Sequence, residues 1–171
     1  MSYGEEDDGG AEVELETLHG RNWPSITQFS VFLENRVGQL KHVFGAFQGS
    51  KVRIVGLTIS DSADCSILRL ILSHSEQGRE ILSLNKLAFA ENELLVVELP
   101  TGPQSLADLC LALLQAEINI HYAYPLLLGP HGSSALAIHV EDHETAVSHL
   151  SNLGFTIFTE KDLEADDAGL N

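Results

Sequence analysis

The sequence of 171 residues predicts an α+β fold that consists of two similar halves, each with the element order βαββαβ. Three observations lead to this prediction. Apolar residues follow a strand period along several short segments, and they recur at helical spacing in the segments between them. The first half of the pattern repeats when the sequence is shifted by about 66 residues. Almost no linker separates the two halves, which favours two copies packed together.

The first half begins with a strand at 26–34, where Phe29, Val31 and Leu33 follow the strand period. A polar turn at 35–38 leads into a helix with an apolar face, and Gly49 stands where a left-handed residue commonly ends a helix. The remaining elements of this half are a strand at 52–59, a turn at 61–64, a strand at 67–72, a helix at 75–86 and a short strand at 87–90.

The second half repeats this order. A shift of 66 residues places Leu99 on Leu33, and a shift of 68 places Leu150 on Leu82. The expected elements are a strand at 94–99, a turn at 100–103, a helix at 104–116, a strand at 118–128, a turn at 129–132, a strand at 135–140, a helix at 142–152 and a last strand that begins at Phe155. Each half should form an antiparallel ferredoxin-like sheet with both helices on one face. The other face or the sheet edge then needs a partner, which the second copy can supply.

The net charge of -16 is concentrated at the two ends of the chain, with seven acidic residues in 1–16 and five in 160–171. We therefore divide the chain into an acidic N-terminal arm at 1–24, a first domain at 25–91, a second domain at 92–160 and an acidic C-terminal tail at 161–171. We expect the arm to be solvated and mobile, the alternative being an arm that docks on a basic partner. The acidic balance excludes nucleic acid and anionic membrane surfaces from the expected partners.

The sequence also predicts a cytoplasmic protein. The longest apolar stretch, at 106–128, is interrupted by polar residues well before it reaches the length of a membrane span. The N-terminus has neither the basic nor the apolar region of a signal peptide. The two cysteines, Cys65 and Cys110, form no CxxC motif and fit a reducing compartment.

Two short motifs resemble those of ACT domains. The stretch from Val31 to Leu40 contains Glu-Asn-Arg-Val-Gly-Gln-Leu, which is similar to the Glu-Asn-Arg-Pro-Gly-x-Leu that joins the first strand to the first helix in that family. Ala116-Glu117-Ile118-Asn119-Ile120 resembles the family's signature at the start of the second strand. Together with the doubled topology, the motifs extend the resemblance over about 25–160. Over this range the chain resembles a stand-alone tandem ACT protein without a catalytic domain. It implies a non-catalytic regulatory protein that binds an amino acid between paired domains, acts on another protein and forms homo-oligomers such as a homodimer.

The resemblance further implies a ligand site built from both halves. In the family, a side-by-side pair takes the loop from one domain and the asparagine of the second strand from the other. The first half keeps the loop and the second half keeps the strand residues, and the predicted ligand-binding residues are Glu34, Asn35, Arg36, Val37, Gly38, Gln39, Leu40, Asn119, Ile120 and His121. The equivalent positions in the opposite halves hold Arg53, Thr101 and Gln104, with Gly102 and Pro103 added to the loop, so a second site should be degenerate or tuned to something else.

The residue types suit a zwitterionic ligand. Backbone N–H groups at a helix N-terminus can hold a carboxylate, and Gly38 allows a close approach of the backbone. An asparagine side chain both donates and accepts hydrogen bonds, so it can serve either end of an amino acid. The plainer interpretation is also open: Asn35 and Asn119 can be ordinary turn residues, and Gly38 can simply permit the loop geometry.

Other chemistry has weaker support. Five of the eight histidines lie in the second half, but they show no metal-ligand spacing, so we predict no metal and no cofactor. No nucleophile or phosphate-binding motif is present, so we predict that the protein is not an enzyme. The main alternative is a protein–protein interaction or oligomerisation scaffold without a small ligand, in which Leu126, Leu127 and Leu128 could belong to an interface.

Overall fold

The computed structural model describes residues 23–34, 36–61 and 65–165. Their elements follow in the order β1 (Ile26–Glu34), α1 (Gln39–Ala46), β2 (Ile54–Asp61), β3 (Cys65–Leu72), α2 (Ser75–Leu84), β4 (Phe89–Glu98), α3 (Ser105–Gln115), β5 (Ile120–Pro125), a 3-10 turn (Pro130–Gly132), β6 (Ala135–Val140), α4 (His143–Asn152) and α5 (Glu160–Ala165). The predicted α+β class is confirmed, and two strands, at 26–34 and 135–140, have the predicted bounds. In the described part of the chain, no helix is long and apolar enough to cross a membrane.

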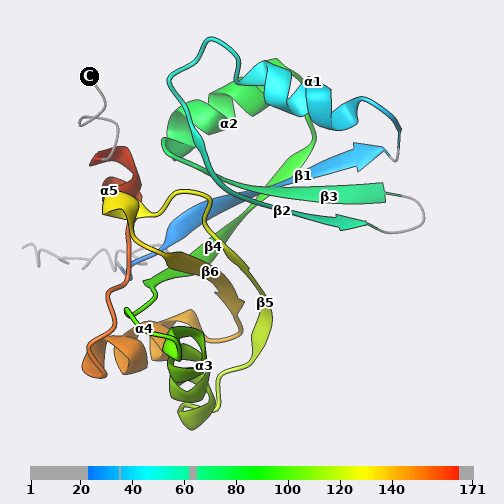
Figure 1. The fold of residues 1–171 in the computed structure, drawn as a ribbon. Coiled ribbons are helices and arrows are strands. Elements are labelled where there is room, and N and C mark those ends of the chain that lie inside the picture. The colour runs from blue at the N-terminus through cyan, green and yellow to red at the C-terminus, as the bar shows by residue number, and fades with distance from the viewer. Residues whose placement is uncertain (1–22, 35, 62–64, 166–171) are drawn as a thin grey trace, which may run out of the picture.

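The strands form one antiparallel sheet in the order β2-β3-β1-β4-β6-β5. We call β1, α1, β2, β3, α2 and the N-terminal part of β4 unit one. Unit two consists of the C-terminal part of β4, α3, β5, β6, α4 and the segment 155–158. Figure 1 shows unit one above unit two, with α1 and α2 on the outer side of the upper strands and α3 and α4 on the outer side of the lower strands. Each unit therefore has its helices on one face, as predicted.

The two units join directly within one strand, without a linker. Instead of separate strands at 87–90 and 94–99, β4 is one continuous strand of ten residues. Its first part pairs with β1, from Val31 opposite Phe89 to Ile26 opposite Leu94, and its last part pairs with β6. The polar residues at 91–93, where the sequence placed the junction of the halves, lie on an exposed stretch of this strand; charged side chains are common there because they protect a sheet edge.

Backbone hydrogen bonds repeat between the units and confirm the internal duplication. The shift of 66 residues relates the first turn of α1 to the first turn of α3, and the shift is 68 from the third strand of each unit onward. The bond from His42 N to Gly38 O in unit one corresponds to the bond from Asp108 N to Gln104 O in unit two. In the same way, Ser73 N to Arg53 O corresponds to Glu141 N to Asn119 O, and Phe32 N to Ala88 O corresponds to Glu98 N to Thr156 O. Arg53 and Asn119 therefore occupy equivalent positions.

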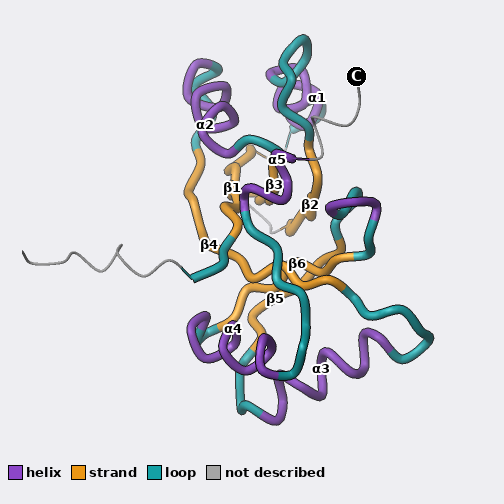
Figure 2. The backbone as a smooth tube through the Cα atoms, turned by 90° about the vertical axis from the view of Figure 1, so that its left-hand side faces the viewer, coloured by secondary structure: helices purple, strands orange, loops and turns teal. Residues whose placement is uncertain are grey.

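The two units stack through the sheet faces that their helices leave uncovered. One apolar cluster lies between β1, β2, β3, β4, β5 and β6 and contains Ile26, Ile71, Leu94, Val96, Tyr124 and Ala137. Each unit has one further apolar cluster, which lies between its strands and its own helices. Figure 2 shows the result from the side, with the strands between α1 and α2 at one outer end and α3 and α4 at the other. Burial of apolar surface drives this arrangement, because each open sheet face would otherwise remain in water.

One side of the stack is closed by backbone contacts between the edge strands. Leu126, just after β5, forms a bridge with Gly56 of β2, and the Leu127 N–H donates to the Val55 carbonyl at 2.8 Å. A methyl group on Gly56 would come within 2.8 Å of the Leu126 side chain, so the glycine permits this approach. Leu126 is partly buried against the central cluster, whereas Leu127 and Leu128 remain exposed.

The end of the chain differs from the prediction. The last strand is reduced to an isolated bridge between Val97 and Ile157. Beyond it, α5 forms within the segment that was predicted to be an acidic tail, and its Leu163 is only 2% exposed, within the central cluster. Glu160, at the start of α5, accepts a hydrogen bond from the Thr27 N–H of β1. The helix thus joins unit two to unit one.

Candidate functional site

The loop between β1 and α1, residues 34–40, forms the first part of the predicted site. Gly38 is the N-cap of α1 and has a φ of 93°, a left-handed conformation that glycine adopts without steric cost. A glycine cannot cap the helix with a side chain, and the first turn of α1 holds no acidic residue. An unfilled helix N-terminus of this kind can receive an anion. Asn35, another predicted site residue, lies outside the described residues.

The loop encloses a small hollow of about 220 Å³ together with Ile59 of β2 and Ser66 of β3. Arg36 and Glu34 form an exposed ion pair at 3.0 Å at its rim. The apolar side chain of Val37 is fully exposed, and Leu40 and Ile59 are more than one-third exposed. Charged groups of both signs and an uncovered apolar surface therefore meet at one place.

The second part of the predicted site is the start of β5. Asn119 precedes this strand, and its Nδ2 donates to a carboxylate oxygen of Glu141 at 2.7 Å. Ile120 and His121 are exposed, and the His121 ring lies 5.1 Å from the ring of His139 on β6. Asn119 is thus fixed at the surface of unit two, with its side-chain oxygen directed to no described donor.

The structure does not bring these two parts together within the chain. The described residues that line the hollow all belong to unit one. Figure 1 shows the end of β1 and the start of β5 far apart, in different units. The expectation of a composite site presumed that the units pair side by side, whereas they stack by their sheet faces to bury the central apolar cluster. The described residues of one chain therefore supply the loop and the strand start as separate surfaces.

A column made of one guanidinium group and two rings joins the two units, and the sequence did not reveal it. The guanidinium carbon of Arg69 on β3 lies 4.5 Å from the centre of the Tyr122 ring on β5. The Tyr122 ring in turn stacks on the His139 ring, with centroids 4.9 Å apart and planes at 9°. Cation–π contact and ring stacking each contribute modestly, so the column stabilises this side of the stack.

The environment of this column disfavours a charged histidine. Burial lowers the pKa of the His139 imidazole. Electrostatic repulsion from His121, Arg69 and His143 lowers the same pKa further. Its Nδ1 atom is buried and accepts or donates no hydrogen bond within the described part of the chain. His139 is therefore neutral at pH 7 and becomes charged only under more acidic conditions than a free histidine.

A second polar contact between the units is centred on Gln28 of β1, which is fully buried. Its Nε2 donates to the Tyr122 hydroxyl at 2.8 Å, and its Oε1 accepts from the Tyr124 hydroxyl at 2.8 Å. Burial raises the pKa of Tyr124, so its hydroxyl remains a donor. No local sequence pattern could have indicated this network, because the partners are more than 90 residues apart.

The histidines do not gather into a metal centre in the described part of the chain. Among those residues, no group of three or more histidine, cysteine, aspartate or glutamate side chains has an arrangement that could hold a metal ion. His143 instead contacts the Pro24 carbonyl at 2.8 Å, and His139 belongs to the ring column. These histidines therefore have structural contacts.

Comparison with known proteins identifies relatives of the fold. The ACT domain pair family matches residues 24–165 of the chain. The crystal structure of protein BT0572 from Bacteroides thetaiotaomicron superposes with a TM-score of 0.74 at 24% identity, over 82% of this chain and 96% of that one. The ligand-free regulatory subunit of aspartate kinase from Thermus thermophilus gives a TM-score of 0.50 at 12% identity, over 75% of this chain and 91% of that one. No functionally curated protein matches the chain.

Proposed function

Because the chain belongs to the ACT domain pair family, we propose that it is a non-catalytic sensor which binds a small ligand, an amino acid, at the loop between β1 and α1. The observation that carries this proposal is the hollow of about 220 Å³ at the N-terminus of α1, beside Gly38. The ligand carboxylate would approach the free N–H groups of the first turn. The ligand side chain would cover Val37 and Leu40, which are exposed.

We further propose that the site is completed by a second copy of the chain. Among the described residues, the walls of the hollow come from unit one only, and the Asn119 side chain is exposed on unit two. In a symmetric homodimer, unit one of each chain could lie beside unit two of the other, which would place Asn119, Ile120 and His121 of one chain against the loop 34–40 of the other. The outer edges of β2 and β5 are open for most of their length among the described residues, so neither blocks such an approach.

The ligand would then act by favouring the paired state. A ligand shifts an equilibrium only as far as its affinities for the two states differ, and a ligand held by two chains binds the pair more tightly than the single chain. Since the proposed activity is regulatory, the output passes to another protein in the cytoplasm.

A thermal-shift screen against the standard amino acids tests the proposal. A ligand that binds only the folded protein raises its unfolding temperature by mass action, so one or a few amino acids should give a shift. Gly38→Glu places a carboxylate at the helix N-terminus and should abolish the shift, whereas Gln104→Glu makes the same change at the equivalent position of unit two and should preserve it. An absence of any shift, or equal losses in the two variants, would count against the proposed site.

A second function, an interaction scaffold, is supported by one specific observation. The helix α3 exposes three leucines, Leu106, Leu111 and Leu114, and Leu114 is 71% exposed. A helix that is apolar on its outer side is usually covered by a partner. Sedimentation of the Leu114→Gln variant tests this alternative. A smaller assembly than that of the wild type would show that α3 forms an interface between chains, and an unchanged assembly would show that this surface is not used for oligomerisation.

A further inference from the structure

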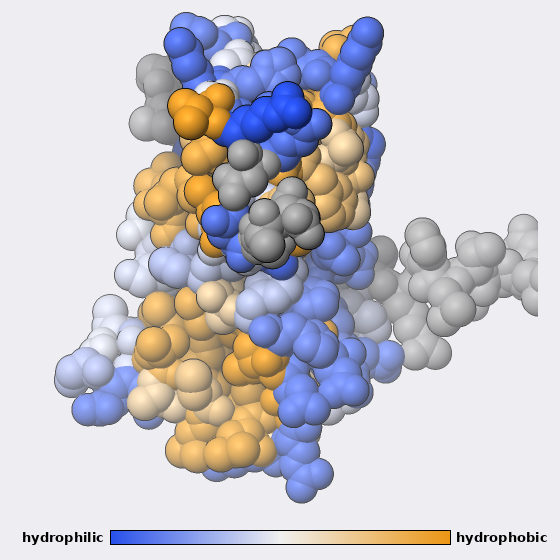
Figure 3. Space-filling view, turned by 90° about the vertical axis from the view of Figure 1, so that its right-hand side faces the viewer, coloured by the Kyte–Doolittle hydropathy of each residue, from blue (hydrophilic) through white to orange (hydrophobic). Residues whose placement is uncertain are grey.

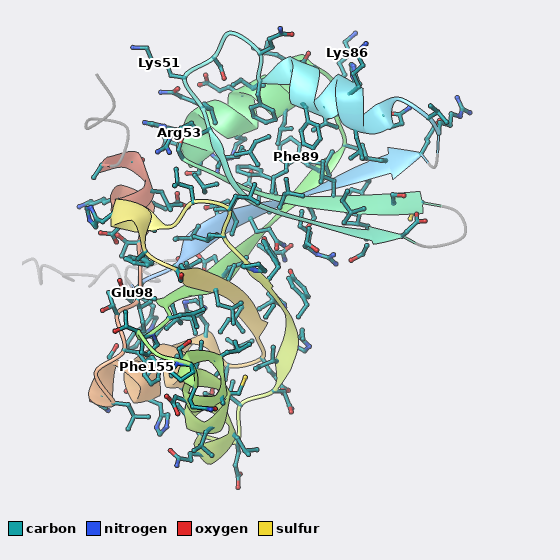
Figure 4. The ribbon with its side chains drawn as sticks, viewed as in Figure 1. Lys51, Arg53, Lys86, Phe89, Glu98 and Phe155 are labelled. Carbon is teal, nitrogen blue, oxygen red and sulfur yellow. The ribbon has the colours of Figure 1, made fainter. Side chains whose placement is uncertain are left out.

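Unit two contains a hollow that the loop site does not include. It has a volume of about 400 Å³ and lies between the end of β4, the loop before α3 and the segment after α4. Glu98 and Thr101 line one side, and Leu153, Phe155 and Thr156 line the other. Figure 4 shows Glu98 and Phe155 on the same side of the lower unit. The two walls are fixed to each other because the Glu98 N–H donates to the Thr156 carbonyl at 2.9 Å.

The polar groups of this hollow have no partner among the described residues. The Glu98 carboxylate is half-buried and forms no ion pair or hydrogen bond with a described residue. The hydroxyls of Thr101 and Thr156 are equally without a hydrogen bond to the described residues. Other surface carboxylates of this protein do find partners; Glu91, for example, accepts two hydrogen bonds from Arg79. A carboxylate and two hydroxyls that lack a partner in the described part of the chain and lie together in a hollow favour a ligand that carries a positive charge and hydrogen-bond donors.

The rest of the lining is apolar and open. Leu153 and Phe155 stand beside the polar groups, and Leu153 is 51% exposed. Gly154 between them has a φ of 85°, and a methyl group built on it would meet nothing within 4 Å. A short alkyl group could therefore lie against Leu153 and Phe155 while a charged end reaches Glu98.

Unit one lacks these features at the equivalent positions. Phe32 corresponds to Glu98 and Ala88 corresponds to Thr156, since the same backbone hydrogen bond joins each pair. Lys86, with a φ of 55°, stands in the place of Gly154. Unit one thus has an aromatic ring where unit two has a carboxylate, and a lysine where unit two has open space. The combination of a carboxylate and an open hollow is therefore found in unit two and not at the equivalent positions of unit one.

We propose that this hollow is a binding site for small primary ammonium compounds. The ammonium group donates to the Glu98 carboxylate and to the hydroxyls of Thr101 and Thr156. The alkyl part lies against Leu153 and Phe155. The site needs one chain only and shares no residue with the loop 34–40, so it stands or falls independently of the function proposed above.

Nuclear magnetic resonance on the full chain tests this proposal. In a ¹H–¹⁵N titration, n-propylammonium should shift the amide signals of Gly154, Phe155 and Thr156, and propionate at the same ionic strength should leave them in place. Glu98→Gln should weaken the binding of propylammonium by tenfold or more, because it removes a charge-assisted hydrogen bond. Glu93→Gln is the matched control, because it removes an exposed carboxylate from the same strand and should leave the affinity unchanged.

A second variant keeps the proposal falsifiable if Glu98→Gln alters the fold. Gly154→Lys introduces the residue that unit one holds in the same left-handed conformation, and its side chain should fill the hollow and abolish the shifts. Shifts that are absent with propylammonium, that appear equally with propionate, or that persist unchanged in both Glu98→Gln and Gly154→Lys would overturn the proposal.

Discussion

The hydrogen bond between Gln28 and Tyr124 offers a direct test of the stacking of the two units. Gln28 lies on β1 of unit one and Tyr124 on β5 of unit two, and their side chains meet at 2.8 Å in the central interface. Gln28 is fully buried and Tyr124 is 5% exposed, so water cannot replace a lost partner. We therefore consider Tyr124→Phe, Gln28→Met and the double variant.

The magnitude follows from what each change leaves behind. Tyr124→Phe leaves the Oε1 of Gln28 buried without its donor, which costs about 1–3 kcal/mol. Gln28→Met leaves the Tyr124 hydroxyl without its acceptor, and the expected cost is again about 1–3 kcal/mol. The double variant replaces both partners by apolar groups and should cost less than the sum, with a coupling energy of about 1–2 kcal/mol.

Urea unfolding followed by circular dichroism at pH 7 measures the four free energies of the cycle. The exposed pair of Arg79 and Glu91 within unit one serves as control, since solvent-exposed ion pairs contribute only about 0.2–1 kcal/mol. A coupling energy between Gln28 and Tyr124 that is indistinguishable from zero would refute the reasoning, because it would mean that the sheet faces of the two units do not meet at these residues.

Three further predictions concern packing and pH. Gly78→Ala should destabilise the protein by about 1–3 kcal/mol, because its Cβ would approach the Leu72 side chain closely, whereas Gly45→Ala, with open space around it, should stabilise α1 by about 0.5–1 kcal/mol; urea unfolding compares them. Because the pKa of His139 is lowered in the folded protein, the unfolded chain takes up a proton at this residue at a higher pH than the folded protein does. The free energy of unfolding should therefore decrease as the pH falls through the free-histidine range, and His139→Phe should flatten the pH dependence of the urea midpoint between about pH 7 and 5. Leu163→Ala should cost about 2–5 kcal/mol, and a cost below about 1 kcal/mol would show that α5 is not docked.

The elements that were predicted correctly are those with a strong local pattern. The strand β1 alternates Phe29, Val31 and Leu33 toward its helices, and all three are buried there. The left-handed residue expected at Gly49 is present, with a φ of 82°. The duplication could be read from the sequence because apolar residues recur at the same spacing in both halves, and the equivalent backbone hydrogen bonds confirm it.

The arrangement of the units could not be predicted in the same way. Ile26 and Ile71 lie on the sheet faces opposite the helices, and their apolar character indicates burial without naming the surface that covers them. The side-by-side expectation came from the family resemblance, and the separation of the loop from Asn119 follows from the burial of these faces against each other. Leu163 was missed because a single apolar residue among acids gives no periodic signal.

The same limit applies to the candidate site. The glycine at the start of α1 and the loop around it could be found from a short motif, because the motif describes local backbone geometry. The hollow beside Glu98 could not, since it depends on residues that are more than 50 positions apart and on the absence of partners for them. Local sequence therefore identifies turns and helix starts, whereas cavities require the tertiary contacts.

The central claim, a ligand site shared between two chains, is tested most directly by mixing two inactive variants. Gly38→Glu disrupts the loop part of the site, and Asn119→Ala disrupts the part at the start of β5. Each variant protein alone should fail to bind the amino acid found by the thermal-shift screen. In an equimolar mixture, half of the symmetric dimers are mixed and each has one intact site, so calorimetry should recover about a quarter of the wild-type stoichiometry. A mixture that binds no more than its separate components would contradict the claim.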